Sequence, residues 1–240
     1  AEQLKAALRT GADAVYLGAK GFNARRNAEN FAETSLEEAI AQCHERGVKV
    51  FVTLNTLVTD DEFSALTAEL DDIAKAQADA VIVQDMGVMS LIRARYPELP
   101  LYASTQTTVH NAEGAVLLDK LGFKQVVLAR ELSAREIRTI QAASPIQIEC
   151  FVHGAHCMCM SGACYLSAML GGRSGNRGLC AQPCRLNFKL GKKERALSLK
   201  DMCLIGHMDE LMQSGIHALK IEGRMKRPEY VAAAVTACRQ

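Results

Sequence analysis

The chain has 240 residues, of which 49% are hydrophobic and 23% charged, and its formal net charge is +1. This composition is typical of an ordinary globular protein that is long enough to bury a core. It excludes a strongly basic nucleic-acid-binding chain and an acidic tail, although it is compatible with a local basic patch. No apolar run reaches about 18 residues, so the sequence predicts no transmembrane helix.

The chain starts with AEQLKAALRTGADAV, which has neither a Met nor the charged-then-apolar order of a signal peptide. We expect a helix over residues 2–9 and interpret the chain as a fragment, with a strand lost before this helix as one possibility. Without an export signal the expected compartment is the cytoplasm. There, clustered cysteines more often bind metal or act in catalysis than form disulfides.

Short apolar runs alternate with amphipathic helical patterns along the chain. The runs are apolar on both faces, as is typical of strands buried in a parallel sheet. The eight predicted strands begin at Ala12, Val48, Ala78, Leu99, Lys124, Ile146, Ala196 and His217. Among the helices between them, the one over residues 35–46 has a capping-box pattern and is followed by Gly47 at its C-terminal end. The next begins at Thr59 or Asp60.

Eight strands, each followed by a helix or an insertion, predict a single α/β domain over residues 1–240, folded as a (β/α)₈ TIM-like barrel. A doubly wound open sheet is the alternative, but LGAKGFNARR matches its Gly-rich phosphate turn poorly. If a strand was lost before the first helix, the run at Ala196 becomes an extra strand outside the barrel.

The regular alternation breaks after the sixth strand, where about 40 residues separate His153 from Ala196. Loops of this length in compact domains are usually functional, and this one leaves the C-terminal end of a strand, which is the active face of such barrels. We therefore predict a cysteine-rich, metal-binding insertion over residues 154–195.

The insertion carries the spacing C-x₆-C-x₁₅-C-x₃-C, formed by Cys157, Cys164, Cys180 and Cys184. Four thiols could hold either zinc or an iron–sulfur cluster, and the residues alone leave both open. Surrounding glycines let the backbone wrap closely around a bulky centre. Cys159 and Cys203 are reserve ligands should Cys184 not bind. The remaining thiols, which we expect to be buried fillers, are Cys43, Cys150 and Cys238.

Several motifs together resemble one family over essentially the whole chain. They are GADAVYLG, ECFVHGAHC, RSGNRGLCAQPCR, SLKDMCLI and KIEGRMKRPEYV. They are similar to the collagenase-like peptidase family of unassigned mechanism (peptidase family U, number thirty-two). One departure is His156, where the family signature has an aliphatic residue.

The resemblance implies a [4Fe–4S] cluster on Cys157, Cys164, Cys180 and Cys184, because family members carry one on cysteines of this kind. Members include hydroxylases of RNA bases, either oxygen-independent or dependent on prephenate as a co-substrate, that act on transfer RNA uridine or ribosomal RNA cytidine. GGRSGNRGLCAQPCR is most similar to the ribosomal RNA branch. We therefore expect a cytoplasmic iron–sulfur enzyme that hydroxylates an RNA base.

Three alternatives remain open. One is a collagenase-like peptidase, for which Cys157, His153 and Glu149 could form a catalytic set, although no nucleophile-plus-base signature and no HExxH motif occurs. Another is hydroxylation of a ubiquinone precursor, and the last is a non-catalytic cluster-bearing scaffold that docks a protein partner.

Polar residues at the predicted strand ends are candidates for a substrate pocket. Arginines among them could bind phosphate or an acidic co-substrate, with Arg173, Arg177 and Arg185 of the insertion adding to them, or they could be solvated without a partner. Asp85 more simply caps the following helix. The strand-end candidates are Asn23, Arg25, Asn55, Gln106, Arg130, Glu131, His153, Glu222 and Arg224. Aromatic residues make up only 5%, so an extended base-stacking platform is not expected.

Overall fold

The computed structural model describes residues 2–24, 36–161, 163–223 and 225–240. The strands are β1 (Ala14–Gly18), β2 (Lys49–Leu54), β3 (Ala80–Val83), β4 (Leu101–Ala103), β5 (Gln125–Val127), β6 (Gln147–Gly154), β7 (Met202–Cys203) and β8 (Ala218–Ile221). The α-helices are α1 (Glu2–Thr10), α2 (Leu36–His44), α3 (Phe63–Lys75), α4 (Met86–Arg95), α5 (Ala112–Lys120), α6 (Ala134–Ala143), α7 (Leu166–Gly171), α8 (Met208–Gln213) and α9 (Pro228–Arg239).

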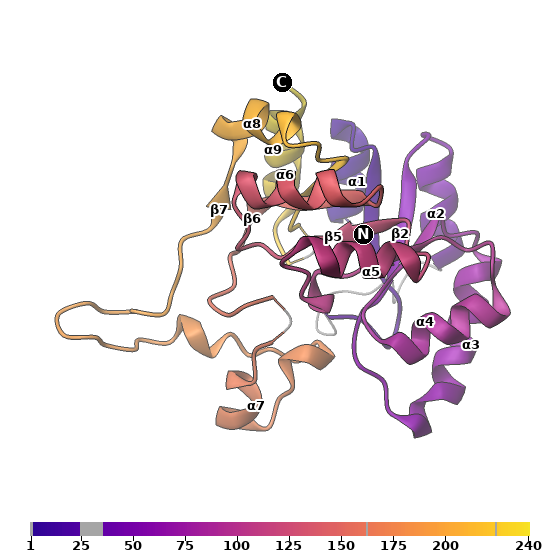
Figure 1. Ribbon diagram of the computed structural model, residues 1–240, viewed down its shortest axis with the longest axis horizontal. Coiled ribbons are helices and arrows are strands. Elements are labelled where there is room, and N and C mark those ends of the chain that lie inside the picture. The colour runs from indigo at the N-terminus through magenta and orange to yellow at the C-terminus, as the bar shows by residue number, and fades with distance from the viewer. Residues whose placement is uncertain (1, 25–35, 162, 224) are drawn as a thin grey trace.

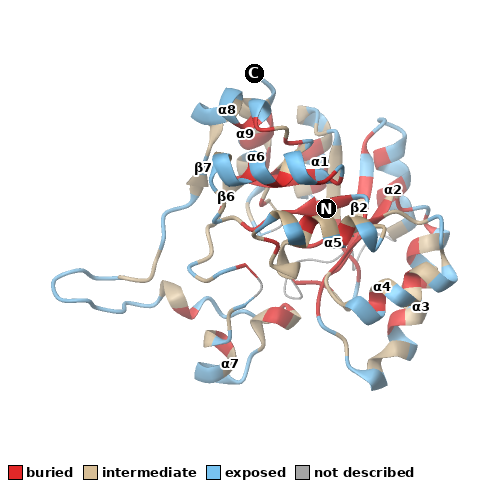
Figure 2. Cartoon of the chain, viewed as in Figure 1, coloured by how far each residue is buried: buried red, intermediate tan, exposed pale blue. Residues whose placement is uncertain are grey.

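Seven of the eight strands form a parallel sheet that alternates with helices. Strands β1 to β6 pair in chain order, and β8 pairs in parallel with β6. Most of the helices pack around the curled sheet, whose strands are largely buried, while α7 lies apart from it (Figures 1 and 2). The α/β class is therefore confirmed, as are seven of the eight predicted strands.

The predicted strand at Ala196 is wrong. Residues 196–201 are not a strand, and β7, which follows them, has two residues that pair antiparallel with His153 and Gly154 at the end of β6. The chain returns here toward the sheet from beyond the strand ends, so it meets β6 in the opposite direction. The apolar pattern of residues 196–201 does not show whether a strand there would pair in parallel or antiparallel with its neighbour.

The core lies between the sheet and the helices. The inner residues of β2 and β3 are fully buried, for example Val50, Val52, Val81 and Val83, and burying each such side chain contributes about 1.5–3 kcal/mol. Capping confirms two predictions: the Asp85 carboxylate accepts hydrogen bonds from Gly87 and Val88, and Glu62 accepts one from the backbone of Thr59 at 2.9 Å. Of the helices described, none is long and apolar enough to cross a bilayer.

The sheet is open between its two outer parallel strands. In the described residues β1 and β8 are not paired with each other, and the Tyr16 hydroxyl donates a hydrogen bond across the opening to the Ile221 carbonyl at 3.3 Å. A cavity of about 770 Å³ lies there, lined by both strands and by α1 and α9. The structure therefore shows a curled, mostly parallel sheet, and its closure into a (β/α)₈ barrel stays a prediction.

Residues 155–201 connect β6 to β7 and contain five of the nine cysteines. Besides α7, this segment holds two short 3₁₀ turns, Gly175–Arg177 and Pro183–Arg185. In Figure 1 it extends from the C-terminal end of β6 away from the helices that flank the sheet. We call it the cysteine segment.

Candidate functional site

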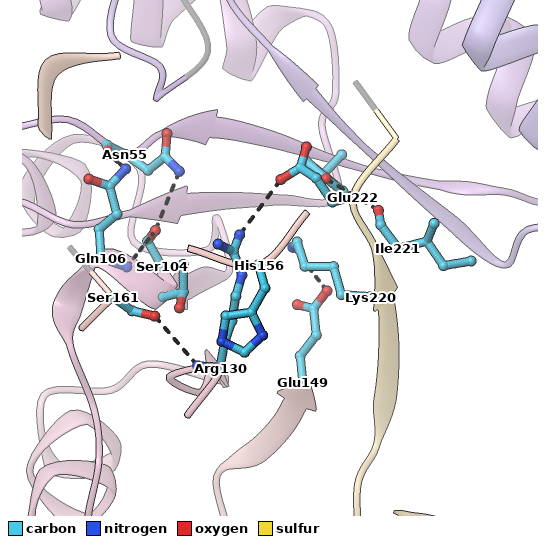
Figure 3. A network of polar contacts seen from close by, with 12 residues as sticks. Asn55, Ser104, Gln106, Arg130, Glu149, His156, Ser161, Lys220, Ile221 and Glu222 are labelled. Atoms are coloured by element: carbon cyan, nitrogen blue, oxygen red, sulfur yellow. Dashed lines mark hydrogen bonds and ion pairs between the residues drawn. The ribbon is translucent and has the colours of Figure 1, made fainter. Parts of the chain in front are cut away.

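Amide and hydroxyl side chains meet where β2 and β4 end. Asn55 accepts a hydrogen bond from the backbone of Ala24 at 2.9 Å and donates one to the Ser104 hydroxyl at 3.3 Å. Gln106 donates from its side chain to the Asn55 carbonyl at 3.0 Å (Figure 3). Asn23 is buried and donates to the Ala19 carbonyl at 2.7 Å. The C-terminal ends of the strands thus carry a polar network, as expected for a barrel, in which functional residues gather at that end of the strands.

Arg130 and Glu222 face each other across the same end of the sheet (Figure 3). Arg130 follows β5 and Glu222 follows β8, and their side chains approach to 3.7 Å with only 12% and 7% of their surfaces exposed. The Arg130 guanidinium also lies 4.1 Å from the ring centroid of Phe151. Its Nε atom is buried without a hydrogen-bond partner in the described residues. Such an arginine retains a donor for a carboxylate or phosphate.

The close approach of β6 and β8 depends on Gly154. Its φ is +132°, and a Cβ placed there would lie 2.6 Å from the Cβ of Glu222. Only glycine adopts this conformation readily and leaves the space that the Glu222 side chain uses. Gly154 therefore positions Glu222 opposite Arg130.

A second buried ion pair lies within the sheet, on strands β6 and β8. Lys220 of β8 binds Glu149 of β6 at 2.9 Å, and the two side chains are 6% and 7% exposed. Gln125 of β5 donates to the other Glu149 oxygen at 2.6 Å, and the Lys220 ammonium lies 4.2 Å from the Tyr16 ring centroid. Sequence reasoning missed Lys220, although a lysine inside an apolar strand is itself a signal, because lysines are almost never buried without a partner.

Glu131 holds the cysteine segment against the strand ends. Its two carboxylate oxygens accept hydrogen bonds from the Ser161 backbone at 2.7 Å and the Ser161 hydroxyl at 3.2 Å. The Ser161 carbonyl accepts one from Thr108 at 2.7 Å. Both oxygens of Glu131 thus bind Ser161 and attach the cysteine segment to the strand ends, while its predicted catalytic role stays a prediction.

Other predicted site residues are placed differently. His153 stacks on Tyr230 of α9 with ring centroids 5.2 Å apart, and its Nδ1 atom is buried without a partner in the described residues. Arg25 and Arg224 lie outside the described residues, so their predicted position beside Arg130 stays a prediction.

Two arginines of the cysteine segment are engaged within the protein. Arg177 forms an ion pair with Glu62, and this hydrogen bond lowers the pKa of the Glu62 carboxyl to about 2. Arg185 donates to the His156 carbonyl at 2.9 Å and to the Ser198 hydroxyl at 3.0 Å. Both side chains are therefore held by other parts of the protein, and only Arg173 of the three is exposed, so a role of these arginines in a ligand-binding rim stays a prediction.

The thiols away from the segment are placed largely as predicted. Cys43 and Cys150 are buried, and burial raises the pKa of Cys43 to about 11 and that of Cys150 to about 12. Cys238 is half-buried and its pKa is raised by burial and by Cys203. Cys203 therefore lies near α9, which weakens its case as a reserve ligand.

The four predicted ligands share one region of the cysteine segment. Burial raises the pKa of the Cys184 thiol, and Arg185 opposes this effect. The thiols of the three other predicted ligands, Cys157, Cys180 and Cys164, raise it further. The backbone at Gly175 is close to two of them, because a Cβ there would lie 3.6 Å from the Cys180 Cβ and 3.7 Å from the Cys164 carbonyl.

Thiolates are the usual ligands of an iron–sulfur cluster, and the Gln182 backbone donates a hydrogen bond to the Cys180 sulfur at 3.3 Å, a contact of the kind that tunes such ligands. Cys159 also interacts with Cys164, so it stays a reserve ligand. The described residues nevertheless contain no group of three or more His, Cys, Asp or Glu side chains that could hold a metal as they stand. Cluster binding by these four cysteines therefore stays a prediction.

Comparison with known proteins adds the family and several relatives. The chain is 42% identical over 229 residues to the 23S rRNA 5-hydroxycytidine C2501 synthase of Escherichia coli, covering 92% of this chain and 34% of that protein. It is 35% identical over 253 residues to the tRNA hydroxylation protein P1 of Bacillus subtilis, covering 100% and 60%. It is 36% identical over 260 residues to a collagenase of Porphyromonas gingivalis, covering 99% and 61%.

Solved structures agree on the fold. The U32 peptidase Mk0906 aligns with a TM-score of 0.52 at 19% identity, covering 61% of this chain and 64% of that one. The aldolase QR15 aligns with a TM-score of 0.53 at 10% identity over 95% of this chain and 86% of that one. The chain spans between a third and about three fifths of the curated relatives named above. The family description Peptidase family U32 matches residues 1–240, and the chain therefore belongs to peptidase family U32.

Proposed function

We propose that this protein is an enzyme that hydroxylates a base of ribosomal or transfer RNA. The observation that carries the proposal is the similarity over 92% of the chain to a protein named for 5-hydroxycytidine synthesis, at 42% identity. Proteins named for tRNA hydroxylation are also similar over nearly the whole chain. RNA is accordingly the proposed partner and the cytoplasm the proposed compartment.

The proposed cofactor is a [4Fe–4S] cluster held by Cys157, Cys164, Cys180 and Cys184. When bound, such a cluster would supply one-electron redox chemistry. The cysteine segment would keep it at the strand ends, because Glu131 attaches Ser161 there through two hydrogen bonds. The Gln182 N–H that donates to the Cys180 sulfur would stabilise negative charge on that ligand.

The strand-end residues are proposed to bind and orient the substrate. Arg130 would bind a carboxylate of an acidic co-substrate such as prephenate, or an RNA phosphate, because its Nε donor has no partner in the described residues. Glu222 would hold the guanidinium in place from the opposite strand. Asn55 and Gln106 would hold neighbouring strand ends in fixed positions, because Gln106 donates to the Asn55 carbonyl and the Asn55 side chain accepts from the Ala24 backbone.

The finer fold proposed for the protein is a (β/α)₈ barrel. Seven parallel strands curl around a common core, and the cavity between β1 and β8 lies where an eighth strand would complete the ring. Helix α1 packs against α9 across this opening, as successive helices of a barrel do.

A peptidase remains the second candidate, because the chain is also 36% identical over 99% of its length to a protein named collagenase. The structure offers no support for the catalytic set of Cys157, His153 and Glu149. Both oxygens of Glu149 are bound, by Lys220 and Gln125, and His153 stacks on Tyr230 instead of pairing with a carboxylate. A nucleophile–base pair requires an orienting group that this arrangement does not supply.

Mass spectrometry of nucleosides from ribosomal and transfer RNA of a deletion strain tests the proposal. We expect one hydroxylated nucleoside to disappear and to return with the full-length protein. The same protein with Cys164→Ser should fail to restore it, whereas a Cys43→Ser variant should restore it. An unchanged RNA profile, together with gelatin cleavage by the purified protein, would refute the proposal in favour of a peptidase.

A further inference from the structure

Residues 186–195 form a projecting hairpin within the cysteine segment, and we call it the basic arm. Leu190 and Lys193 exchange two backbone hydrogen bonds of 2.9 and 3.0 Å. The turn between them is Gly191–Lys192, with φ +58° at Gly191, as a two-residue hairpin turn with glycine in its first position requires. All ten residues are exposed, and Figures 1 and 2 show the arm as the long loop that projects away from the body of the protein before β7.

The base of the arm is held in place. Arg185, which precedes the arm, binds the Ser198 hydroxyl and the Leu199 carbonyl, which follow it, and also the His156 carbonyl at the start of the cysteine segment. Within the arm the Asn187 side chain accepts a hydrogen bond from the Arg195 backbone at 3.0 Å. These contacts fix the direction in which the arm leaves the protein, so its charges have a defined position relative to the cysteine segment.

The arm is far more basic than the chain as a whole. It holds four cations and one anion, a net charge of +3 in ten residues, whereas all 240 residues carry +1. Its one acidic residue, Glu194, pairs with Lys189 at 3.1 Å. Lys192, Lys193 and Arg195 form no ion pair within the described part of the chain. Three cations therefore face solvent on one narrow element.

Apolar side chains lie among these cations. Leu186, Phe188 and Leu190 are 58%, 37% and 73% exposed. Leu190 and Lys193 are directly opposite in the hairpin, so their side chains share a face. The arm therefore exposes three apolar side chains among its cations. Cations interleaved with an aromatic ring match the chemistry of a nucleic-acid strand, which offers phosphates and base faces.

We propose that the basic arm binds the phosphate backbone of the RNA whose base is presented to the strand-end site, with Phe188 stacking on a base. This rests on the proposed function for the identity of the polyanion. Lys192, Lys193 and Arg195 neutralise phosphates, and the anchored base of the arm sets the distance between the bound backbone and the cysteine segment.

Fluorescence anisotropy with a labelled RNA stem-loop tests the proposal on the full-length protein, as a function of KCl concentration. The arm variant is Lys192→Gln with Lys193→Gln and Arg195→Gln. Each lost phosphate contact lowers the magnitude of the slope of log K against log salt by about 0.7–0.9, so the triple variant should lose about 2.1–2.7. Its affinity at about 50 mM salt should fall at least about tenfold. Phe188→Ala should weaken binding about fivefold or more without changing the slope.

The matched control removes three exposed cations at the opposite ends of the strands, Lys49→Gln, Lys120→Gln and Lys124→Gln. We expect its slope and affinity to equal those of the unmodified protein. An arm variant with an unchanged slope overturns the proposal, as does a control variant that loses as much binding. Loss of binding to an acidic protein or to anionic vesicles, with RNA binding intact, assigns the arm to another partner and overturns it as well.

The binding experiment tests the arm separately from the proposed hydroxylation reaction. If the unmodified protein binds RNA through the arm but no hydroxylated nucleoside depends on it, the proposed function fails and the arm's role stands. If hydroxylation depends on the protein while the arm variant binds RNA normally, the arm proposal alone fails.

Discussion

The buried pair of Lys220 and Glu149 supports the strand-end site from below, and replacing Lys220 by Met tests how much. Methionine keeps most of the apolar stem of lysine and removes its charge. The Glu149 carboxylate, 7% exposed, would then keep only the hydrogen bond from Gln125 at 2.6 Å. The variant therefore leaves a negative charge inside the sheet without a cation.

Removing one partner of a buried ion pair costs about 3–5 kcal/mol, because the remaining charge has lost its solvent and its partner. With 6% and 7% exposure and a separation of 2.9 Å, this pair belongs to that class. We expect Lys220→Met to lower the free energy of unfolding by about 3–5 kcal/mol. Adding Glu149→Gln removes the bare charge and keeps a side chain that can bond to Gln125, so the double variant should be more stable than either single variant.

Urea unfolding followed by circular dichroism measures all four proteins, since a change in midpoint at constant slope reports stability alone. If Lys220→Met costs less than about 1 kcal/mol, the pair behaves like a surface ion pair and the reasoning is refuted. The reasoning is equally refuted if the costs of the two single changes add in the double variant, because additivity shows that the residues do not interact.

Three further predictions concern Gly154, Glu62 and the cysteines. Gly154→Ala should cost at least about 1–3 kcal/mol of stability in urea unfolding, because φ is +132° and its Cβ would overlap the Cβ of Glu222, whereas Gly171→Ala, with open space around it, should change little. The Glu62 carboxyl has a folded pKa of about 2 against an ordinary 4.5, so its stabilising effect is complete above pH 4.5 and is lost as the pH falls toward 2. Glu62→Gln should therefore lower stability at pH 7, and the difference from the unmodified protein should shrink on acidification; a difference that is constant with pH would contradict the ion pair with Arg177. Protein purified without oxygen should contain about four irons per chain, and Ser at Cys157, Cys164, Cys180 or Cys184 should remove them while Ser at Cys43 or Cys238 should not; stoichiometric zinc without iron or sulfide would exclude the cluster.

Features that depend on neighbouring residues in the chain were predictable. The apolar runs that became β1 to β6 and β8 predict strands because a buried strand needs apolar residues on both faces. Asp85 caps α4 because an N-cap carboxylate binds backbone N–H groups only two or three residues further on. The strand predicted at Ala196 is wrong, because its apolar pattern is short and a strand forms only where a neighbouring strand offers hydrogen bonds.

The sequence by itself determined the α/β class, the order of the elements, the family and the polar residues at the strand ends, since each of these is written in local patterns and motifs. Only the tertiary structure decided which of those polar groups are committed to one another. Arg177 meets Glu62 across 115 positions of the chain, Lys220 meets Glu149 across 71, and Glu131 meets Ser161 across 30. Charges and hydrogen-bonding groups act over a few ångströms in space whatever their separation in the chain, so the choice of partner appears only once the sheet has curled and brought the strand ends together.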